Sequence, residues 1–301
     1  MVQPEFTPIG TAEPFIIAVD NGGTNTRVEA RLGNQRLGDM VDYGTPHNYD
    51  TAVATLAEAA TSLAQTEDRP IDAIGFAVAG EISQDGDRLV RAGELNDYGW
   101  VLRPFQIDIA NAIGLEAARV VLLNDCVAAA KAQQVHNQRI RSDLYAYVSA
   151  ISTGFGGAGF DGNRLIADEP GHEFLRSGAI CGCGQDGCAE AHISGSGIER
   201  NRGIRAENLP AAQWEEVTAD AVDAYAQLLK RLDEQFDLTP KTLYYFGSVA
   251  VNAPGLLAGI SKGLLARRYE LPILPNIAFA THGEDSGIVG AGDAAIELIA
   301  A

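Results

Sequence analysis

The sequence predicts an α/β fold of two similarly built lobes that face a cleft. Apolar strands alternate along the chain with segments of helical periodicity, which is the pattern of an α/β fold. A strand, a glycine-rich turn and a returning strand near the N-terminus are followed, from residue 144, by a second unit of the same kind. With 301 residues and 46% hydrophobic content, the chain is long enough for each lobe to bury its own core.

The first half begins with a strand, because residues 15–20 are almost entirely apolar. Gly22 and Gly23 break this strand, and extended alternation resumes over 27–32. An alanine-rich helix follows, with Asp50 as its expected N-cap and its end near residue 65. The remaining elements are a buried strand over 71–78 that ends at Gly80, a helix over 103–113, and a strand over 119–123 that leads into Asn124, Asp125 and a second alanine-rich helix.

The second half repeats this order. A strand over 144–150 is followed by a glycine-rich turn over 152–159 and by a return strand from Phe160. We place the lobe boundary near Asn124, with residues 1–124 as a small lobe that begins with a loose tail over 1–14, and with 125–285 as a larger lobe. The remaining elements are a long helix over 211–236, a strand over 243–246, a helix after Gly247 and Ser248, and a last helix over 286–301 that is expected to pack back on the first lobe.

The net charge of −18 argues against nucleic acid or an anionic membrane as a partner, because like charges repel. No apolar run approaches the length of about 20 residues that a membrane span needs. Residues 1–14 contain three prolines and no basic cluster, so they resemble a loose tail more than a signal peptide. The cytoplasm is therefore the expected compartment.

Three of the four cysteines, Cys181, Cys183 and Cys188, lie within eight residues, and His172 precedes them by nine. This is the ligand set of a closed, structural Cys3His zinc site. A disulfide is the weaker alternative, because three clustered cysteines leave one unpaired. The zinc would order the loop that carries His172, Glu169 and Glu190.

Two glycine-rich turns could bring backbone N–H groups to phosphate oxygens. In the first, Asp20 also offers a carboxylate to a hydrated metal ion and Thr24 a hydroxyl. The second contains G-x-G-x-x-G at Gly154, but a hairpin follows it and the expected ribose acid is missing, so we reject a dinucleotide site. Hairpin glycines are often purely structural. A nucleotide clamped between the turns, with Asn124 and Asp125 between them, is the functional alternative.

On these residues the chain resembles the ROK family of sugar kinases, repressors and related proteins. The similarity covers nearly the whole chain after the tail, and the cysteine loop is its most specific part. The segments that carry it are 20–27, Asn124-Asp125, 153–157, 169–172, the cysteine loop with Glu190, 194–195, 247–248 and 287–291.

The resemblance implies a two-lobed, actin-like (ribonuclease-H-like) ATPase fold with a zinc-binding loop, and ATP, Mg²⁺ and Zn²⁺ as cofactors. It implies that Asp125 is the catalytic base, that Asn124, Asp125, Glu169, His172 and Glu190 bind the sugar, and that His172, Cys181, Cys183 and Cys188 bind zinc. The residues expected at the nucleotide are Asp20, Gly22, Gly23, Thr24, Asn25, Thr153, Gly154, Gly156, Gly157 and Gly247.

The expected function is phosphorylation of a free hexose by ATP to the hexose 6-phosphate, with glucose as the first substrate and N-acetylglucosamine or N-acetylmannosamine as the alternative. A sugar and ATP are the expected small-molecule partners of a homo-oligomer, a dimer. Family repressors carry a DNA-binding domain before the first turn, and 14 residues precede Phe15 here. A sugar-responsive regulator and a sugar-binding protein without catalysis are the less favoured alternatives. Without the resemblance, Asp125 would be read as a helix N-cap.

Overall fold

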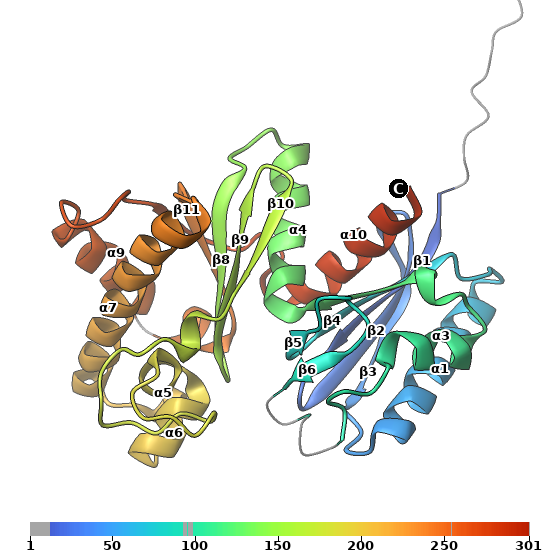
Figure 1. Cartoon of the computed structure of the whole chain (residues 1–301), viewed down its shortest axis with the longest axis horizontal. Coiled ribbons are helices and arrows are strands. Elements are labelled where there is room, and N and C mark those ends of the chain that lie inside the picture. Colours follow the sequence, from blue (N-terminus) through green and yellow to red (C-terminus); the bar gives the residue numbers. More distant parts are fainter. Residues whose placement is uncertain (1–12, 93–94, 96–98, 254, 301) are drawn as a thin grey trace, which may run out of the picture.

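The computed structural model describes residues 13–92, 95, 99–253 and 255–300. It places two five-stranded sheets in separate lobes, with two helices between them (Figure 1). Most of the predicted tail, residues 1–12, lies outside the described residues.

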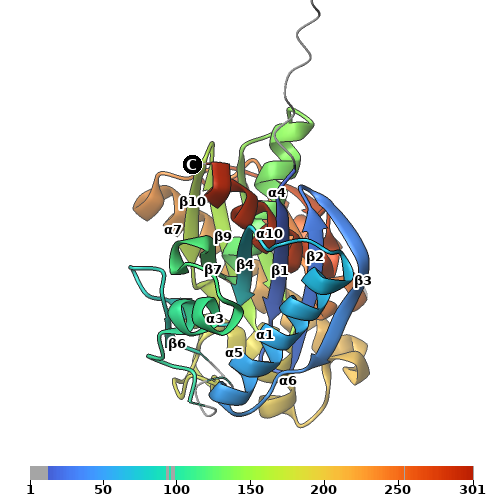
Figure 2. The same cartoon turned by 90° about the vertical axis from the view of Figure 1, so that its right-hand side faces the viewer.

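The first sheet has the order β3-β2-β1-β4-β7. Its strands β1 (Phe15–Asn21), β2 (Asn25–Leu32) and β3 (Gln35–Gly44) form an antiparallel meander, and β4 (Ala73–Val78) and β7 (Val120–Asn124) continue it in parallel with β1. Helices α1 (Tyr49–Thr66) and α3 (Phe105–Ile113) cover one face, as Figure 2 shows. Trp100 is fully buried in the core beneath them.

The second sheet repeats this order as β10-β9-β8-β11-β12. The meander is β8 (Tyr145–Ile151), β9 (Phe155–Asp161) and β10 (Arg164–Asp168), and the parallel strands are β11 (Thr242–Phe246) and β12 (Asn276–Phe279). The two sheets therefore share one topology, which confirms the predicted repetition of the strand-turn-strand unit. Helix α4 (Asp125–Arg139) covers one face, and the other packs against a group of helices: α5 (Ala189–Ile193), α6 (Gly195–Arg202), α7 (Ala211–Phe236), α8 (Ser248–Asn252) and α9 (Leu256–Ala266).

The last helix, α10 (Ser286–Ala300), returns to the first lobe and packs on β1 and β4, as expected, and it also crosses α4. Glycines make this close approach possible. A methyl group at Gly290 would overlap the backbone carbonyl of Ala128 in α4, and one at Gly75 in β4 would overlap that of Ala291 in α10. The chain thus joins its lobes at a crossing of two helices. The exact domain boundary at Asn124 stays a prediction.

Two predicted boundaries are wrong. The first helix begins one residue before Asp50, and its N-cap is Asn48, whose side chain accepts a hydrogen bond from the N–H of Thr51. The glycine-rich turn expected over 152–159 is shorter, because the strand that returns from it is β9, which pairs antiparallel with β8 and begins at Phe155 rather than at Phe160. Gly157 lies in β9, where the ring of Tyr147 packs directly against it and leaves no room for a side chain.

Several elements were not predicted. These are β3, the short hairpin of β5 (Glu81–Ile82) and β6 (Leu89–Arg91), helices α5, α6 and α9, and β12. None of the helices in the described part of the chain has the length and apolarity that crossing a bilayer requires.

Candidate active site

The parallel strands β1, β4 and β7 end at one edge of the first sheet, where Asn21, Val78 and Asn124 lie in register. Strand ends in such sheets present groups to a cleft. Asn124 caps α4, since its Oδ1 accepts from the N–H groups of Cys126 at 2.9 Å and Val127 at 3.2 Å. The side-chain amide of Asn124 donates to the carbonyl of Gly80, which lies just beyond the end of β4.

Asp125 is the first residue of α4, and Asn124 is its N-cap, so the cap role that Asp125 alone would suggest belongs to its neighbour. One oxygen of Asp125 accepts from the N–H of Cys126 at 2.9 Å. Burial and the nearby Asp20 carboxylate raise the pKa of Asp125 from 3.8 to about 6. Glu169, just after β10, behaves in the same way: burial and the charge of Asp125 raise its pKa from 4.5 to about 7. The three carboxyl groups therefore form one electrostatically coupled cluster.

The first glycine turn joins β1 to β2 and closes with a hydrogen bond of 2.9 Å from the N–H of Gly22 to the carbonyl of Asn25. Asp20 stands at its start and pairs with Arg27 at 2.5 Å. Arg27 also bonds to Asp285, at 2.7 Å, just before α10. Burial nevertheless raises the pKa of Asp20 above its ordinary value, because Arg27 does not offset the whole cost of removing the carboxylate from water.

The second glycine turn spans residues 152–154 and is held from two sides. The N–H groups of Gly195 and Ser196 donate to the carbonyls of Ser152 and Thr153 at 2.8 and 3.0 Å. Glu190 accepts from the N–H of Phe155 at 3.1 Å. Gly247, with φ of 98°, lies against the backbone of Ile151, where a side chain would collide with the carbonyl. The structure thus brings 153–154, Gly247 and Glu190 together.

Gly156 lies in β9, where a side chain would meet the sulfur of Cys126. Gly156 and Gly157 therefore have packing reasons to be glycine, in addition to any contact with phosphate.

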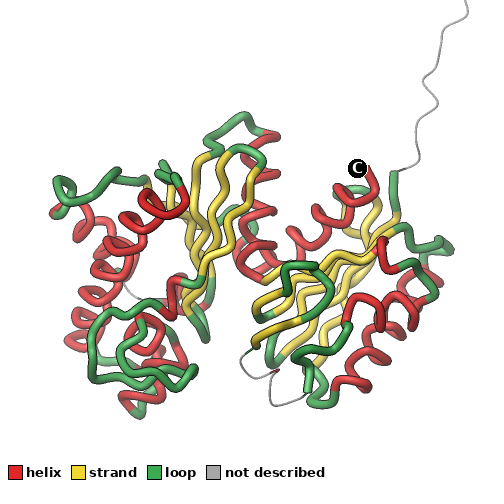
Figure 3. Tube along the Cα trace, in the orientation of Figure 1, coloured by secondary structure: helices red, strands yellow, loops and turns green. Residues whose placement is uncertain are grey.

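The expected zinc ligands form one cluster. One ligand atom from each of His172, Cys181, Cys183 and Cys188 lies within 4.8 Å of every other. The Sγ atoms of Cys183 and Cys188 are 3.7 Å apart, and Nδ1 of His172 is 3.7 Å from Sγ of Cys181. Ligands at about 2.3 Å from a tetrahedral ion are separated by about 3.8 Å, so the cluster has the size of a zinc site. Most of the segment that holds it is loop, as Figure 3 shows.

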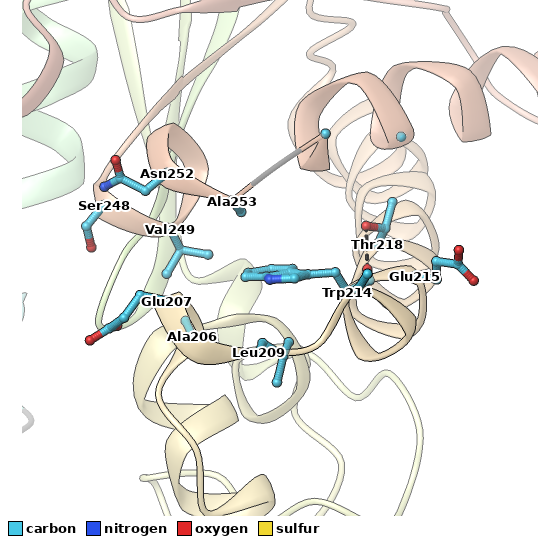
Figure 4. Close-up of a pocket in the computed structure, with 13 residues that line it drawn as sticks. Ala206, Glu207, Leu209, Trp214, Glu215, Thr218, Ser248, Val249, Asn252 and Ala253 are labelled. Carbon is cyan, nitrogen blue, oxygen red and sulfur yellow. Dashed lines mark hydrogen bonds between the residues drawn. The ribbon is translucent and has the colours of Figure 1, made fainter.

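Two cavities adjoin these groups. One of about 490 Å³ lies between the lobes, where Glu81, Asn124, Glu169 and Arg231 contribute to its wall. The other, of about 710 Å³, lies beside the Gly247 turn among α7, α8 and α9. Figure 4 shows the indole of Trp214 extending between Val249 and Leu209 in this second cavity.

The motifs did not identify four polar groups beside the site: Arg27, Asp168, Arg231 and the carbonyl of Gly80. No spacing signals them. Most of their partners are distant in the chain: Asn124 is 44 residues from Gly80, Arg231 is 63 residues from Asp168, and Asp285 is 258 residues from Arg27.

The raised pKa of Asp125 predicts a pH-dependent effect on stability. The pKa of Asp125 in the folded chain lies above its unfolded value. The contribution of this group to the free energy of unfolding is therefore fully present below the unfolded pKa and is lost as the pH rises through about 6. Asp125→Asn removes the buried charge and should stabilise the protein by about 1 to 3 kcal/mol at pH 8, and by little at pH 4.

Urea denaturation at both pH values tests this expectation, with Asp233→Asn, at an exposed site on α7, as the control. An equal effect of Asp125→Asn at both pH values would show that ionisation of this carboxyl group does not destabilise the folded protein.

The family model described as the ROK family matches residues 16–297. An N-acetylmannosamine kinase of Vibrio vulnificus is 29% identical over an alignment of 276 positions, which covers 84% of this chain and 86% of that protein. An N-acetyl-D-glucosamine kinase of Pectobacterium atrosepticum is 27% identical over 304 residues, covering 90% and 96%.

Among solved structures, a ROK hexokinase from Thermus thermophilus superposes with a TM-score of 0.74 at 24% identity, and covers 92% of this chain and 96% of its own. A ROK family glucokinase from Streptomyces griseus, in complex with glucose and AMPPNP, also gives a TM-score of 0.74, at 23% identity with 94% and 99% covered. These likenesses agree with the two duplicated sheets and the helices between them. Because the family model matches almost the entire described chain, the protein belongs to the ROK family.

Proposed function

We propose that this chain is an ATP-dependent sugar kinase that phosphorylates the 6-hydroxyl of a free hexose or N-acetylhexosamine, with Asp125 as the base. The observation that carries the proposal is the position of Asp125. It stands at the end of a parallel strand, within the electrostatic reach of Asp20 on the first glycine turn and of Glu169 on the cysteine side of the cleft.

In the reaction, the 6-hydroxyl oxygen attacks the γ-phosphorus of ATP in line, the new O–P bond forms, and the bond from the γ-phosphorus to the bridging oxygen breaks to release ADP. Asp125 accepts the hydroxyl proton. A carboxyl group whose pKa is about 6 is mostly ionised at neutral pH, and is more basic than an ordinary aspartate.

The sugar is held by Asn124, Glu169, His172 and Glu190 in this proposal. Each offers a directional partner to a hydroxyl group, and a buried site of this kind rejects analogues that leave its polar groups unpaired. Glu190 has a second task, because the N–H of Phe155 binds it. Helix α5, which carries Glu190, is thereby tied to the second glycine turn.

ATP would lie along the two glycine turns, with its phosphates near Gly22, Gly23, Thr24, Gly154 and Gly247. The cavity beside Gly247 supports this placement of the nucleotide. Its largest side chain is the indole of Trp214, and flat apolar surfaces suit a nucleoside base. Mg²⁺ supplies charge neutralisation to the phosphates when bound. Asp20 would hold its waters, and its incompletely compensated buried carboxylate fits a nearby cation.

The Cys3His cluster fits Zn²⁺ by its donor atoms and by its size. Such an ion would fix the loop and take no part in the reaction. His172 points Nδ1 toward the cluster, so the other ring nitrogen is the one we assign to the sugar.

An N-acetylhexosamine is favoured by the curated relatives at 27–29% identity, which are N-acetylmannosamine and N-acetylglucosamine kinases. Glucose is the simpler acceptor for the same set of hydroxyl partners. The fold likeness to a glucokinase leaves that choice open, since it concerns the fold alone.

A coupled assay of ADP release across free sugars tests the function. We expect turnover with glucose, N-acetylglucosamine or N-acetylmannosamine, and a preference among them set by the group at C2. Each unpaired polar group in the site should cost about 1 to 3 kcal/mol in specificity. Fructose is the control, and a clear preference for it would refute the pyranose site. ADP release that no sugar stimulates would refute the kinase proposal itself.

Asp125→Asn should lower kcat by about 10²- to 10⁴-fold, because the amide keeps its size but cannot accept the proton. Sugar and nucleotide binding, measured by calorimetry on folded protein, should change little. Turnover within about threefold of the wild type would show that Asp125 is not the catalytic base.

Metal analysis should find about one zinc per chain. Cys183 is exposed, so Cys183→Ser tests the cluster with little disturbance of packing, and it should lower the zinc content and raise KM for the sugar. Cys126→Ser, at the fourth cysteine outside the cluster, is the control for metal content. Full zinc content in the Cys183 variant would exclude this ligand set.

A further inference from the structure

We propose that helix α7 positions the sugar-binding loop through two ion pairs, one at each end of the segment 168–176, which we call the sugar loop. This inference rests on the proposed function, since Glu169 and His172 within the loop are the expected sugar ligands. The two pairs are Arg231 with Asp168 and Asp220 with Arg176. Neither α7 residue is among the expected ligands, so both are positioning residues.

The first pair holds the start of the loop. Asp168, the residue before Glu169, has a side chain that is only 3% exposed. Its Oδ2 accepts from Nη2 of Arg231 at 2.8 Å and from the hydroxyl of Tyr147 at 2.8 Å. The same guanidinium also binds Glu173, beyond His172, through Nη1. Arg231 therefore bridges two acids that flank both ligands, and fixes their separation.

The second pair holds the end of the loop. Nε and Nη2 of Arg176 donate to the two oxygens of Asp220 at 2.6 and 2.7 Å, which is the bidentate geometry that restricts orientation most. The carbonyl of Arg176 also lies 2.8 Å from Nε2 of His192, which is buried on α5 two residues after Glu190. This pair thus connects the sugar loop to the helix that carries the remaining expected ligand.

The two ion pairs determine where the expected sugar ligands lie relative to α7. The sugar loop has only the short 3₁₀ helix Pro170–His172 and one β-bridge at Phe174 as regular structure after β10. An error of about 1 Å in a binding group can cost up to about a hundredfold in rate. Helix α7 is 26 residues long and packs on the second sheet, so it offers a rigid reference. Both ion pairs lie on that reference, and neither includes a residue of the glycine turns.

The helix also supplies a matched control. Asp223, one turn from Asp220, pairs with Arg267, the C-cap residue of α9, and no hydrogen bond or ion pair joins it to the sugar loop in the described chain. Its charge reaches Arg176 only through space. Asp223→Asn removes an aspartate of the same helix by the same change. Arg231→Lys is the conservative variant, because it keeps one charge but cannot bridge two acids through a planar fork.

The experiment measures KM for sugar, KM for ATP and kcat in Arg231→Gln, Arg231→Lys, Asp220→Asn and Asp223→Asn. We expect Arg231→Gln and Asp220→Asn to raise KM for sugar by about tenfold or more, with KM for ATP within about twofold of wild type. Arg231→Lys should fall between Arg231→Gln and wild type, and Asp223→Asn should match wild type. Loss of fold alone would lower the active fraction, and hence apparent kcat, without separating the two KM values.

A double variant adds a second test. If the pair acts as a unit, Asp168→Asn combined with Arg231→Gln should be no worse than the worse single variant. Hydrogen exchange of peptides over 168–176 reads the same constraint without catalysis, and should be faster in Arg231→Gln and Asp220→Asn than in Asp223→Asn.

Unchanged exchange and an unchanged KM for sugar would overturn the positioning role. Faster exchange in a protein that no sugar stimulates would uphold the ion pairs as the constraint on the loop, and would reject the proposed function instead.

Discussion

The close crossing of α4 and α10 is the constraint on which the site depends. Helix α4 begins at the end of β7 and lies on the second sheet, whereas α10 leaves the second sheet and lies on the first. Gly290 lets the two backbones meet, and Gly287, one turn earlier on α10, lies against the carboxylate of Asp20. The crossing thereby sets how near the first glycine turn comes to Asp125. A bulkier residue at Gly290 would force α10 away from α4.

This arrangement has an electrostatic cost. It crowds Asp20, Asp125 and Glu169 into a partly dry cleft, where burial raises all three pKa values. The charge of Asp20 raises the pKa of Asp125 further, and the charge of Asp125 does the same to Glu169. A fold selected for stability alone would place neutral groups there. Perturbed carboxyl groups that face a cleft are typical of functional sites, where the cost serves proton transfer or cation binding. Arg27 relieves part of it by joining Asp20 to Asp285 at the base of α10.

The sequence predicted the parts of this molecule that local rules determine. The apolar runs identified β1, β4, β7, β8 and β11, and the repeated strand-turn-strand pattern predicted the duplicated sheets. The cysteine spacing predicted a cluster whose geometry agrees with it. Strand β3 was missed because it is largely exposed and half polar, so it shows no apolar periodicity. The second glycine turn was drawn too long because glycine marks close packing in β9 as readily as it marks a turn.

Long-range polar contacts could not be predicted in this way. The partners of Asp168 on α7 and of Asn124 at Gly80 are chosen by tertiary packing, which no local pattern records. The same holds for the cap of α1. Both Asn48 and Asp50 are good caps, and the choice between them depends on where the chain leaves β3.

Within the described chain, the path passes from the first sheet to the second at Asn124 and returns after β12, and both passages lie beside the crossing of α4 and α10. Two such connections define an axis about which one lobe can rotate relative to the other. Points close to an axis of rotation move little, whereas distant points travel far. Asp20 lies against Gly287 of α10 and Asp125 begins α4, so both carboxylates stand beside the crossing. Any rotation of one lobe about this axis would therefore change the spacing of these carboxylates less than that of groups at the outer edges of the lobes, such as strand β3.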